Sequence, residues 1–345
     1  MSADNREIRW AVLGTGIIAN EMAQALESAG RSVYAVGNRT HEKAVEFARK
    51  YNIGKVYDDF HEMFTDENVD VIYLTTPHNT HIEFMIQALS NGKHVMCEKS
   101  ITLNSGELKM AADLAREKGL LLAEAMTVYH MPLYKKLREI VDSGRLGPVR
   151  MIQLNFGSFK EYDMTNRFFN MDLAGGALLD IGVYAISLAR YFMTSKPDQV
   201  LSQVKYAPSG ADEQSGILLM NCQGEMAVIS LTLHAKQPKR VVIACENAYI
   251  EVLEYPRADK AVIVHTETGE KEIIEAGSRD MALKYEMDDM EAAIRSGGTM
   301  FLPYSIDVMD IMTGIRKEWG MYYPSEKCAL ENQPSESRPP KACPC

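Results

Sequence analysis

Short apolar runs alternate with amphipathic segments over the first third of the chain. The apolar runs are Ile8–Gly14, Ser32–Asn38, Lys55–Tyr57, Val69–Thr76, His94–Glu98 and Leu120–Met126. Between them, the segments with apolar residues on one helical face are Ala19–Ala29, His41–Lys50, His81–Asn91 and Ser105–Lys118. Strands separated by helices predict βαβ units and a doubly wound parallel sheet, so we expect an α/β domain over residues 1–126.

The pattern changes after residue 126. The region from Val200 to Ile274 consists of successive apolar runs separated by turn residues such as Gln223-Gly224, which is typical of an antiparallel meander. A further strand is predicted over Val149–Phe159. The predicted helices are Leu133–Ser143, Ala174–Phe192, Asp280–Arg295 and Tyr304–Gly320. We therefore expect residues 127–323 to form an α+β domain with a large, mostly antiparallel, open-faced sheet.

From Pro324 onward, Pro, Ser, Glu and Lys dominate and no periodicity remains, so 324–345 is predicted to be a disordered tail. Its last residues, Cys343-Pro344-Cys345, offer two thiols, whereas a structural zinc site uses four ligands. We therefore expect no metal site there. Two folded domains with an open sheet face also favour a homodimer or homotetramer that forms through the C-terminal sheet.

Composition narrows the class of protein. The chain has 345 residues, 46% of them hydrophobic and 24% charged, as in two ordinary globular domains. The net charge of -10 argues against a nucleic-acid partner, because such partners are bound through Lys and Arg. No uninterrupted apolar run reaches the roughly 18 residues that a membrane span needs. The polar N-terminal residues lack the apolar core of a secretory signal, so a cytoplasmic location is expected.

The motif Gly14-Thr15-Gly16-Ile17-Ile18-Ala19 follows a predicted strand and opens a helix. In a Rossmann domain, the first glycine allows the tight turn and the second lets the backbone approach a pyrophosphate. The helix N-terminus adds free N–H groups and a positive dipole end. Gly14, Gly16, Ile17 and Ile18 are therefore predicted to bind a dinucleotide.

The end of the second strand indicates which dinucleotide is bound. A carboxylate there would hydrogen-bond the ribose 2′-hydroxyl of NAD, but the sequence reads Gly37-Asn38-Arg39-Thr40. A guanidinium can pair with a 2′-phosphate through two parallel bonds. Asn38 and Arg39 therefore favour NADP(H), while NAD(H) use stays open.

Two further strand ends carry polar groups at the carboxyl edge of the sheet, where open α/β sheets place ligands. The fourth strand ends in Thr75-Thr76-Pro77 with His81 close behind, and these residues are predicted to contact the cofactor. The fifth strand ends in Glu98-Lys99, and both residues are also predicted to contact the cofactor. A lysine beside a nicotinamide could lower the pKa of a neighbouring hydroxyl, which makes Lys99 a candidate catalytic residue.

Asp180 and Tyr184 lie four residues apart after the glycine pair Gly175-Gly176, so they share one side of the predicted helix. A carboxylate and a phenol together can hold a sugar hydroxyl and accept its proton. Without further context, a helix-start aspartate and a core tyrosine would explain the pair equally well.

Gly14–Ala19, Glu98-Lys99 and the glycine pair before Asp180–Tyr184 together resemble the Gfo/Idh/MocA (glucose–fructose oxidoreductase/inositol dehydrogenase) family, over roughly residues 5 to 325. Members usually have Glu-Lys-Pro where this chain has Glu-Lys-Ser100. The tyrosine at position 184 is similar to the dihydrodiol and aldose dehydrogenase branch, in which the residues matching Lys99 and Tyr184 act together and the residue matching Asp180 orients the substrate. The same resemblance implies that Arg167 and Met126 contribute to the substrate pocket.

The resemblance implies an NADP(H)-dependent dehydrogenase or reductase that transfers a hydride between nicotinamide and a CH–OH carbon of a sugar, polyol or cyclic diol. Tyr184 would be the general base, with its pKa lowered by Lys99. Two alternatives stay open: an enzyme that retains its cofactor and uses transient sugar oxidation for elimination or hydrolysis, and a cofactor-sensing regulator without catalysis.

Overall fold

The computed structural model describes residues 7–331. Its N-terminal part is a six-stranded sheet of order β3-β2-β1-β4-β5-β6, in which every pair of neighbours is parallel. The strands are β1 (Trp10–Leu13), β2 (Ala35–Gly37), β3 (Lys55–Tyr57), β4 (Val71–Leu74), β5 (His94–Glu98) and β6 (Leu122–Ala125). The predicted parallel sheet is confirmed, and its order reverses between β1 and β4, which is where such sheets bind ligands.

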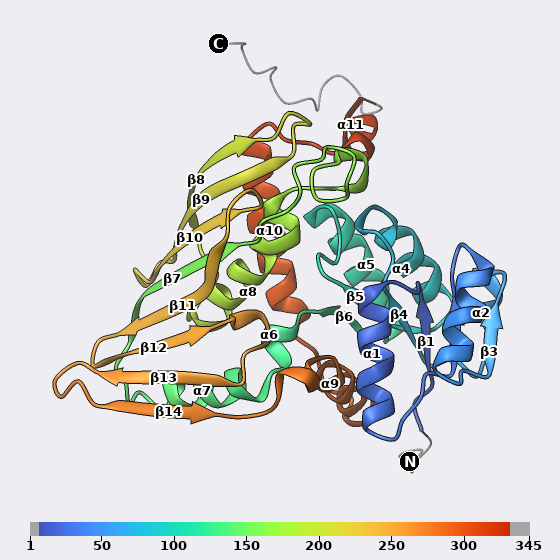
Figure 1. The fold of residues 1–345 in the computed structure, drawn as a ribbon, viewed down its shortest axis with the longest axis horizontal. Coiled ribbons are helices and arrows are strands. Elements are labelled where there is room, and N and C mark those ends of the chain that lie inside the picture. Colours follow the sequence, from blue (N-terminus) through green and yellow to red (C-terminus); the bar gives the residue numbers. More distant parts are fainter. Residues whose placement is uncertain (1–6, 332–345) are drawn as a thin grey trace.

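Five helices connect these strands (Figure 1). They are α1 (Ile17–Ser28), α2 (His41–Lys50), α3 (Phe60–Thr65), α4 (His81–Ser90) and α5 (Ser105–Lys118). Helix α3 is absent from the sequence prediction because six residues give too few turns for a helical period to emerge. The others start and end within about two residues of the predicted bounds, as is usual for helix ends.

A helix from the far end of the chain completes this first domain. Helix α9 (Ala282–Ser296) places Leu283, Met287 and Met290 in one core cluster with Met22 of α1. Trp10 Nε1 donates a hydrogen bond to Glu291 Oε1 at 2.8 Å. Sequence position assigned this segment to the second domain, whereas its apolar face packs on the first.

The second sheet has eight strands in the order β14-β13-β12-β11-β7-β10-β9-β8. The strands are β7 (Val149–Gly157), β8 (Gln199–Tyr206), β9 (Asp212–Met220), β10 (Met226–Thr232), β11 (Gln237–Cys245), β12 (Ala248–Leu253), β13 (Lys260–His265) and β14 (Lys271–Glu275). The sheet is mostly antiparallel, as predicted. The expectation of one continuous meander is wrong, because β7 inserts between β10 and β11 and runs parallel to β10.

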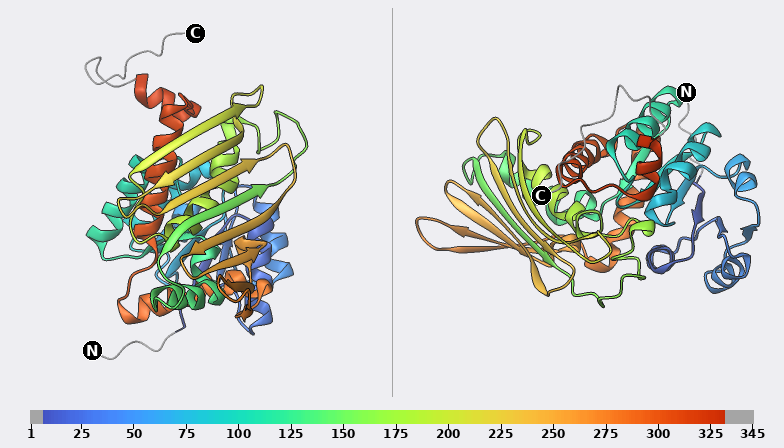
Figure 2. Two further views of the ribbon diagram at one scale, coloured as in Figure 1. Left: turned by 90° about the vertical axis from the view of Figure 1, so that its left-hand side faces the viewer. Right: turned by 90° about the horizontal axis from the view of Figure 1, so that it is seen from above.

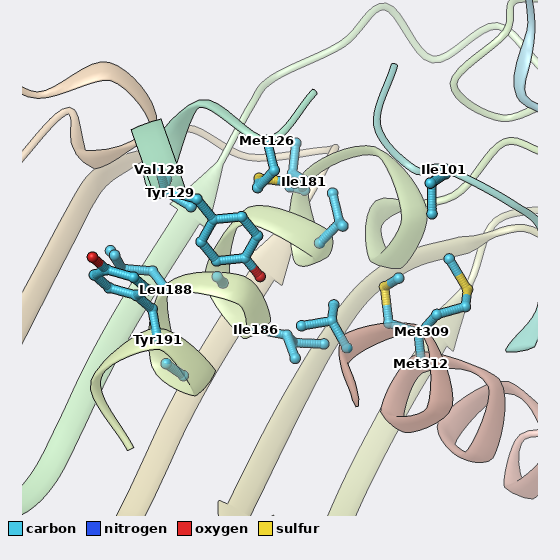
Figure 3. Packing of buried hydrophobic residues seen from close by; sticks show 14 of the residues in the cluster. Ile101, Met126, Val128, Tyr129, Ile181, Ile186, Leu188, Tyr191, Met309 and Met312 are labelled. Carbon is cyan, nitrogen blue, oxygen red and sulfur yellow. The ribbon is translucent and has the colours of Figure 1, made fainter. Parts of the chain in front are cut away.

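Helices cover one face of the second sheet and leave the other open (Figure 2). The covering helices include α6 (Thr127–His130), α7 (Pro132–Asp142), α8 (Val183–Phe192) and α10 (Leu302–Glu318). Between helices and sheet lies a core of apolar side chains, including Tyr129, Ile186, Leu188, Tyr191, Met309 and Met312 (Figure 3). Strand β7 alternates accordingly, with Ile152 and Leu154 buried and Met151 exposed.

The predicted helix Ala174–Phe192 begins later than expected. Ala174 and Gly176 have positive φ angles of 56° and 132°, so the chain turns there before the π-helical turn η3 (Leu178–Gly182) leads into α8. By length and composition, Met171–Phe192 could cross a membrane, but 72% of its most apolar 18-residue window is buried inside the protein. The segment packs as part of the core.

The prediction of a disordered tail from Pro324 is wrong for its first residues, which form helix α11 (Pro324–Glu331). The cause is a buried charge on α10. Arg316 is almost completely buried and donates to both carboxylate oxygens of Glu326, at 2.7 and 2.9 Å. A buried guanidinium needs such a partner, and low hydrophobicity of the segment does not reveal it. Residues 332–345, including Cys343 and Cys345, lie outside the described residues.

Candidate active site

The end of β5 and the π-helical turn η3 meet at Lys99. Lys99 Nζ donates to the backbone oxygen of Asp180 at 2.5 Å and lies 3.3 Å from Asp180 Oδ1. Both side chains are largely shielded from solvent. The structure therefore brings together two predicted catalytic residues that are 81 positions apart in the sequence.

The Tyr184 ring lies next to the same Lys99 ammonium. Lys99 Nζ is 4.9 Å from the centroid of the Tyr184 ring, within the range of a cation–π interaction. Tyr184 follows η3 directly at the start of α8, so the turn that fixes Asp180 also fixes the phenol. Single π-helical turns inserted in α-helices frequently occur at functional sites. The three predicted catalytic side chains thus form one cluster.

Ser100, which stands where family members have proline, contributes a second link between the domains. Its buried Oγ donates to Leu179 O at 2.8 Å, and the peptide bond between Lys99 and Ser100 is cis. His78 Nε2 lies 2.9 Å from Lys99 O. Because a carbonyl only accepts hydrogen bonds, Nε2 carries the proton of that imidazole. Sequence reasoning missed His78 and Ser100 as supports, although both flank the motifs it selected.

The electrostatics favour a charged pair at Lys99 and Asp180. Burial acts to lower the pKa of Lys99, but the carboxylate of Asp180, with smaller effects of Tyr184 and Glu98, outweighs it and the pKa is raised. Burial likewise acts to raise the pKa of Asp180, but Lys99, Arg167 and His78 outweigh it and the pKa is lowered. An ammonium therefore faces a carboxylate.

The predicted lowering of the Tyr184 pKa toward neutrality is wrong for the chain without ligands. Burial raises the pKa of Tyr184, and the opposing effect of the Lys99 ammonium is smaller. Glu98 accepts a hydrogen bond from Tyr73 Oη, and its negative charge further raises the pKa of Tyr184. Tyr184 is therefore a neutral phenol, ready to donate a proton.

Asp212, at the start of β9, holds the beginning of η3. Its completely buried carboxylate accepts a hydrogen bond from Leu178 N at 2.6 Å. Gly176 lies against the same carboxylate with φ of 132°, and a Cβ at that position would overlap Asp212 Oδ1. Tyr323 Oη donates to Gly175 O at 3.0 Å from the other side. The glycine pair is thus enclosed by side chains from distant segments.

The glycine motif has the geometry that a dinucleotide phosphate requires. Gly14 has φ of 110°, and a Cβ there would overlap Thr75 Oγ1. Gly16 has open space at its Cβ position, and α1 has neither a side-chain N-cap nor an acidic residue in its first turn. Ile17 is 82% exposed and Ile18 is partly exposed. Anions bind such an uncapped helix start through its free N–H groups.

An open surface pocket lies at this helix start. It is lined by Thr15, Gly16, Ile17, Asn20, Glu21, Gln24 and Lys50. The residues present therefore fit a dinucleotide. Beyond β2, Asn38 Nδ2 donates to Thr40 O at 2.9 Å, and Arg39 is exposed with no ion pair to any side chain within residues 7–327. An exposed guanidinium thus lies at the position predicted to select the cofactor.

Two predicted ligand contacts need correction. The side chain of His81 is completely buried, and its two ring nitrogens face Thr76 O at 2.8 Å and Ser100 O at 3.1 Å. It braces the two strand ends, leaving no atom free for the cofactor. Met126 is also completely buried, in the core beside η3, so it cannot line a substrate pocket (Figure 3). Side-chain burial is a tertiary property that neither motif encodes.

The other predicted contacts lie at the edge of the site. Thr75, Thr76 and Pro77 are partly or fully exposed directly after β4. Arg167 is 62% exposed, and its Nη1 lies 3.8 Å from Asp180 Oδ1. Arg167 therefore approaches the catalytic cluster from the loop that precedes η3.

Comparison with known proteins agrees with this arrangement. Residues 8–126 match the model of the "oxidoreductase family, NAD-binding Rossmann fold", and residues 134–251 match the GFO/IDH/MocA C-terminal domain. Trans-1,2-dihydrobenzene-1,2-diol dehydrogenase from Xenopus laevis is 32% identical over 248 residues, 71% of this chain and 74% of that protein. The Mus musculus enzyme of the same name is 31% identical over 243 residues, 69% and 72% of the respective chains.

Solved structures show the same fold. A 3-ketoreductase from Actinomadura kijaniata, in complex with NADP and TDP-benzene, has a TM-score of 0.80 at 23% identity and covers 90% of this chain and 98% of its own. Levoglucosan dehydrogenase in complex with NADH and levoglucosan has a TM-score of 0.83 at 18% identity, with coverage of 91% and 98%.

A dinucleotide-type glycine turn joined to a lysine, aspartate and tyrosine cluster defines an NAD(P)-dependent oxidoreductase. More particularly, the chain belongs to the Gfo/Idh/MocA family of dehydrogenases and reductases.

Replacing Gly176 by alanine should remove most activity, because the new Cβ overlaps Asp212 and the positive φ is strained. We expect the free energy of unfolding, from urea denaturation, to fall by at least about 2 kcal/mol relative to the matched variant Gly210→Ala. Gly210 also has a positive φ (90°) but lies in open space. Equal effects of the two substitutions would show that Asp212 does not enclose Gly176.

Proposed function

We propose that this protein is an NADP(H)-dependent oxidoreductase acting on a CH–OH group, or the corresponding carbonyl, of a sugar, polyol or cyclic diol. The observation that carries the proposal is the contact of Lys99 with Asp180 and the Tyr184 ring at the carboxyl edge of a dinucleotide-binding sheet. The names of its relatives support it, because they include diol and levoglucosan dehydrogenases and a 3-ketoreductase. A regulator that only senses cofactor would not need a proton donor beside an ammonium.

When bound, the nicotinamide supplies or accepts the hydride. Tyr184, as a neutral phenol, donates its proton to the carbonyl oxygen during reduction, and the neighbouring Lys99 ammonium stabilises the phenolate that results. In oxidation, the Tyr184 phenol first releases its proton to solvent, and the phenolate, stabilised by Lys99, then accepts the hydroxyl proton. Asp180 accepts a hydrogen bond from a substrate hydroxyl and fixes the reacting carbon, because correct positioning supplies much of the rate. Burial of the cluster excludes water from it.

Tyr184→Phe and Lys99→Met should lower the turnover number by about 10²- to 10⁴-fold, since one removes the proton and the other the charge that stabilises the phenolate. NADPH binding, measured by fluorescence titration, should persist in both. The matched control is Tyr249→Phe, at an exposed position on β12. Near wild-type turnover of a diol or sugar by either site variant would disprove the proposed roles.

We further propose that NADP(H) is preferred over NAD(H), because the exposed Arg39 guanidinium, which has no ion pair within residues 7–327, can pair with a 2′-phosphate. Arg39→Asp should lower kcat/KM for NADPH by about 10- to 100-fold while kcat/KM for NADH holds or rises. The control with the same change of charge is Lys118→Asp at the exposed end of α5. The preference is refuted if the NADPH to NADH ratio of kcat/KM stays the same in Arg39→Asp.

The open face of the second sheet is proposed to join a second copy of the chain. Leu201, Leu218 and Val228 are cross-strand neighbours on that face, and Leu201 and Leu218 are 69% and 40% exposed. Such an apolar row supports the proposal of an association surface on this face. Leu218→Glu should shift the mass measured by light scattering toward the monomer, whereas Met110→Glu, at an isolated exposed position on α5, should not. A monomeric wild-type protein would contradict this.

A further inference from the structure

Two cations flank one aromatic ring beside the catalytic aspartate. Lys160 Nζ lies 4.2 Å and Arg167 Cζ 4.3 Å from the centroid of the Phe168 ring. All three residues belong to the loop that connects β7 to η3, which lies between the second sheet and the first domain (Figure 2). Asn79 Nδ2 ties this loop to the first domain by donating to Asp172 O at 3.4 Å. Arg167 Nη1 also lies 3.8 Å from Asp180 Oδ1, so the two cations lie beside the position proposed for the substrate.

Several cations gather near Asp180. Lys99 already neutralises Asp180 at 3.3 Å, so Arg167 is an additional cation on the same carboxylate. Lys239 Nζ lies 5.1 Å from the Phe156 ring, which packs 6.1 Å from the Tyr184 ring, and its partner is Glu254 at 3.4 Å. Four cations, with Lys160 the fourth, thus lie near Asp180 and the Tyr184 ring, and within residues 7–327 the exposed Glu161, Asp163 and Asp172 of the same loop form no ion pair with them.

Lys160 is the unsatisfied member of this group. Within residues 7–327, no carboxylate lies within ion-pair distance of its partly buried ammonium. Burial lowers the pKa of Lys160. The nearby charge of Asp180 acts to raise this pKa, whereas the cations Arg167, Lys239 and Lys99 act to lower it.

Gathering like charges in a partly desolvated place costs folding energy, and this chain does so against a net charge of -10. An anion bound between the cations would offset that cost. The cofactor phosphates do not explain the cluster, because the glycine motif offers them a separate site at the start of α1, lined by different residues. The remaining candidate is the substrate itself.

We propose that the substrate carries an oxyanion, a carboxylate or a phosphate ester, which Lys160 and Arg167 bind while Asp180 and Tyr184 hold the reacting CH–OH group. This inference rests on the proposed function and specifies its substrate class as an acidic or phosphorylated polyhydroxy compound. Phe168 holds the two cations in place by contact with both.

The test compares three ligands of one carbon skeleton: a hexose, its uronate and its 6-phosphate. Calorimetric titration of the enzyme loaded with NADP⁺ should show that the uronate or the phosphate binds at least about tenfold more tightly than the hexose. Whichever of the uronate and the 6-phosphate gains more affinity over the hexose identifies the oxyanion as a carboxylate or a phosphate ester. In Lys160→Gln, the ratio of charged to neutral affinity should fall about tenfold, whereas in Lys271→Gln, on the exposed edge strand β14, it should match wild type.

Equal affinity for charged and neutral ligands, or an unchanged ratio in Lys160→Gln, overturns the proposal. Parallel assays of NADPH formation separate it from the proposed function. If the hexose is oxidised and charged ligands show no advantage, the oxidoreductase function is supported and the proposal that the substrate carries an oxyanion is refuted. If a charged ligand binds more tightly but is never oxidised or reduced, in any variant or direction, the oxyanion site is supported and the proposed oxidoreductase function fails.

Discussion

One ammonium group joins the two domains at the point where we propose that the chemistry takes place. Lys99 projects from the end of β5 and bonds both the backbone and the carboxylate of Asp180 in η3. Breaking one side of such a shielded pair costs about 3–5 kcal/mol, because the remaining charge is left uncompensated. The position of Asp180, and of Tyr184 after it, therefore depends on the parallel sheet of the first domain as much as on the second domain.

The π-helical turn is held from several directions at once. Asp212 binds its first N–H group, Ser100 bonds the carbonyl of Leu179, and Tyr323 bonds the carbonyl of Gly175. Each comes from a different part of the chain. A catalytic constellation needs this kind of external support, because small errors in position cost large factors in rate. The C-terminal helix α11 belongs to the same support, since Glu326 pairs with Arg316 and also accepts from Tyr323 N.

Much of the first domain could be read from the sequence, because its periodicity is local. The βαβ alternation, the Gly14–Ala19 turn and the polar strand ends are each contained in short segments, and parallel strands place their carboxyl ends at one edge whatever their exact register. The same logic placed Lys99 at that edge. The insertion of β7 beside β10, the packing of α9 on α1 and the ordering of α11 depend on contacts between distant segments, which no local pattern contains.

The sequence by itself determined the dinucleotide turn, the residue types of the proposed catalytic cluster and the absence of a carboxylate where Arg39 stands, because each is a matter of side-chain chemistry at fixed spacing. Only the tertiary structure decided which side chains are free to act. Packing buried His81 and Met126, and burial raised the pKa of Tyr184 instead of letting Lys99 lower it. Folding also gathered Lys160 and Arg167 around one ring. Burial and charge proximity are sums over the whole fold, so they exist only once distant segments have packed.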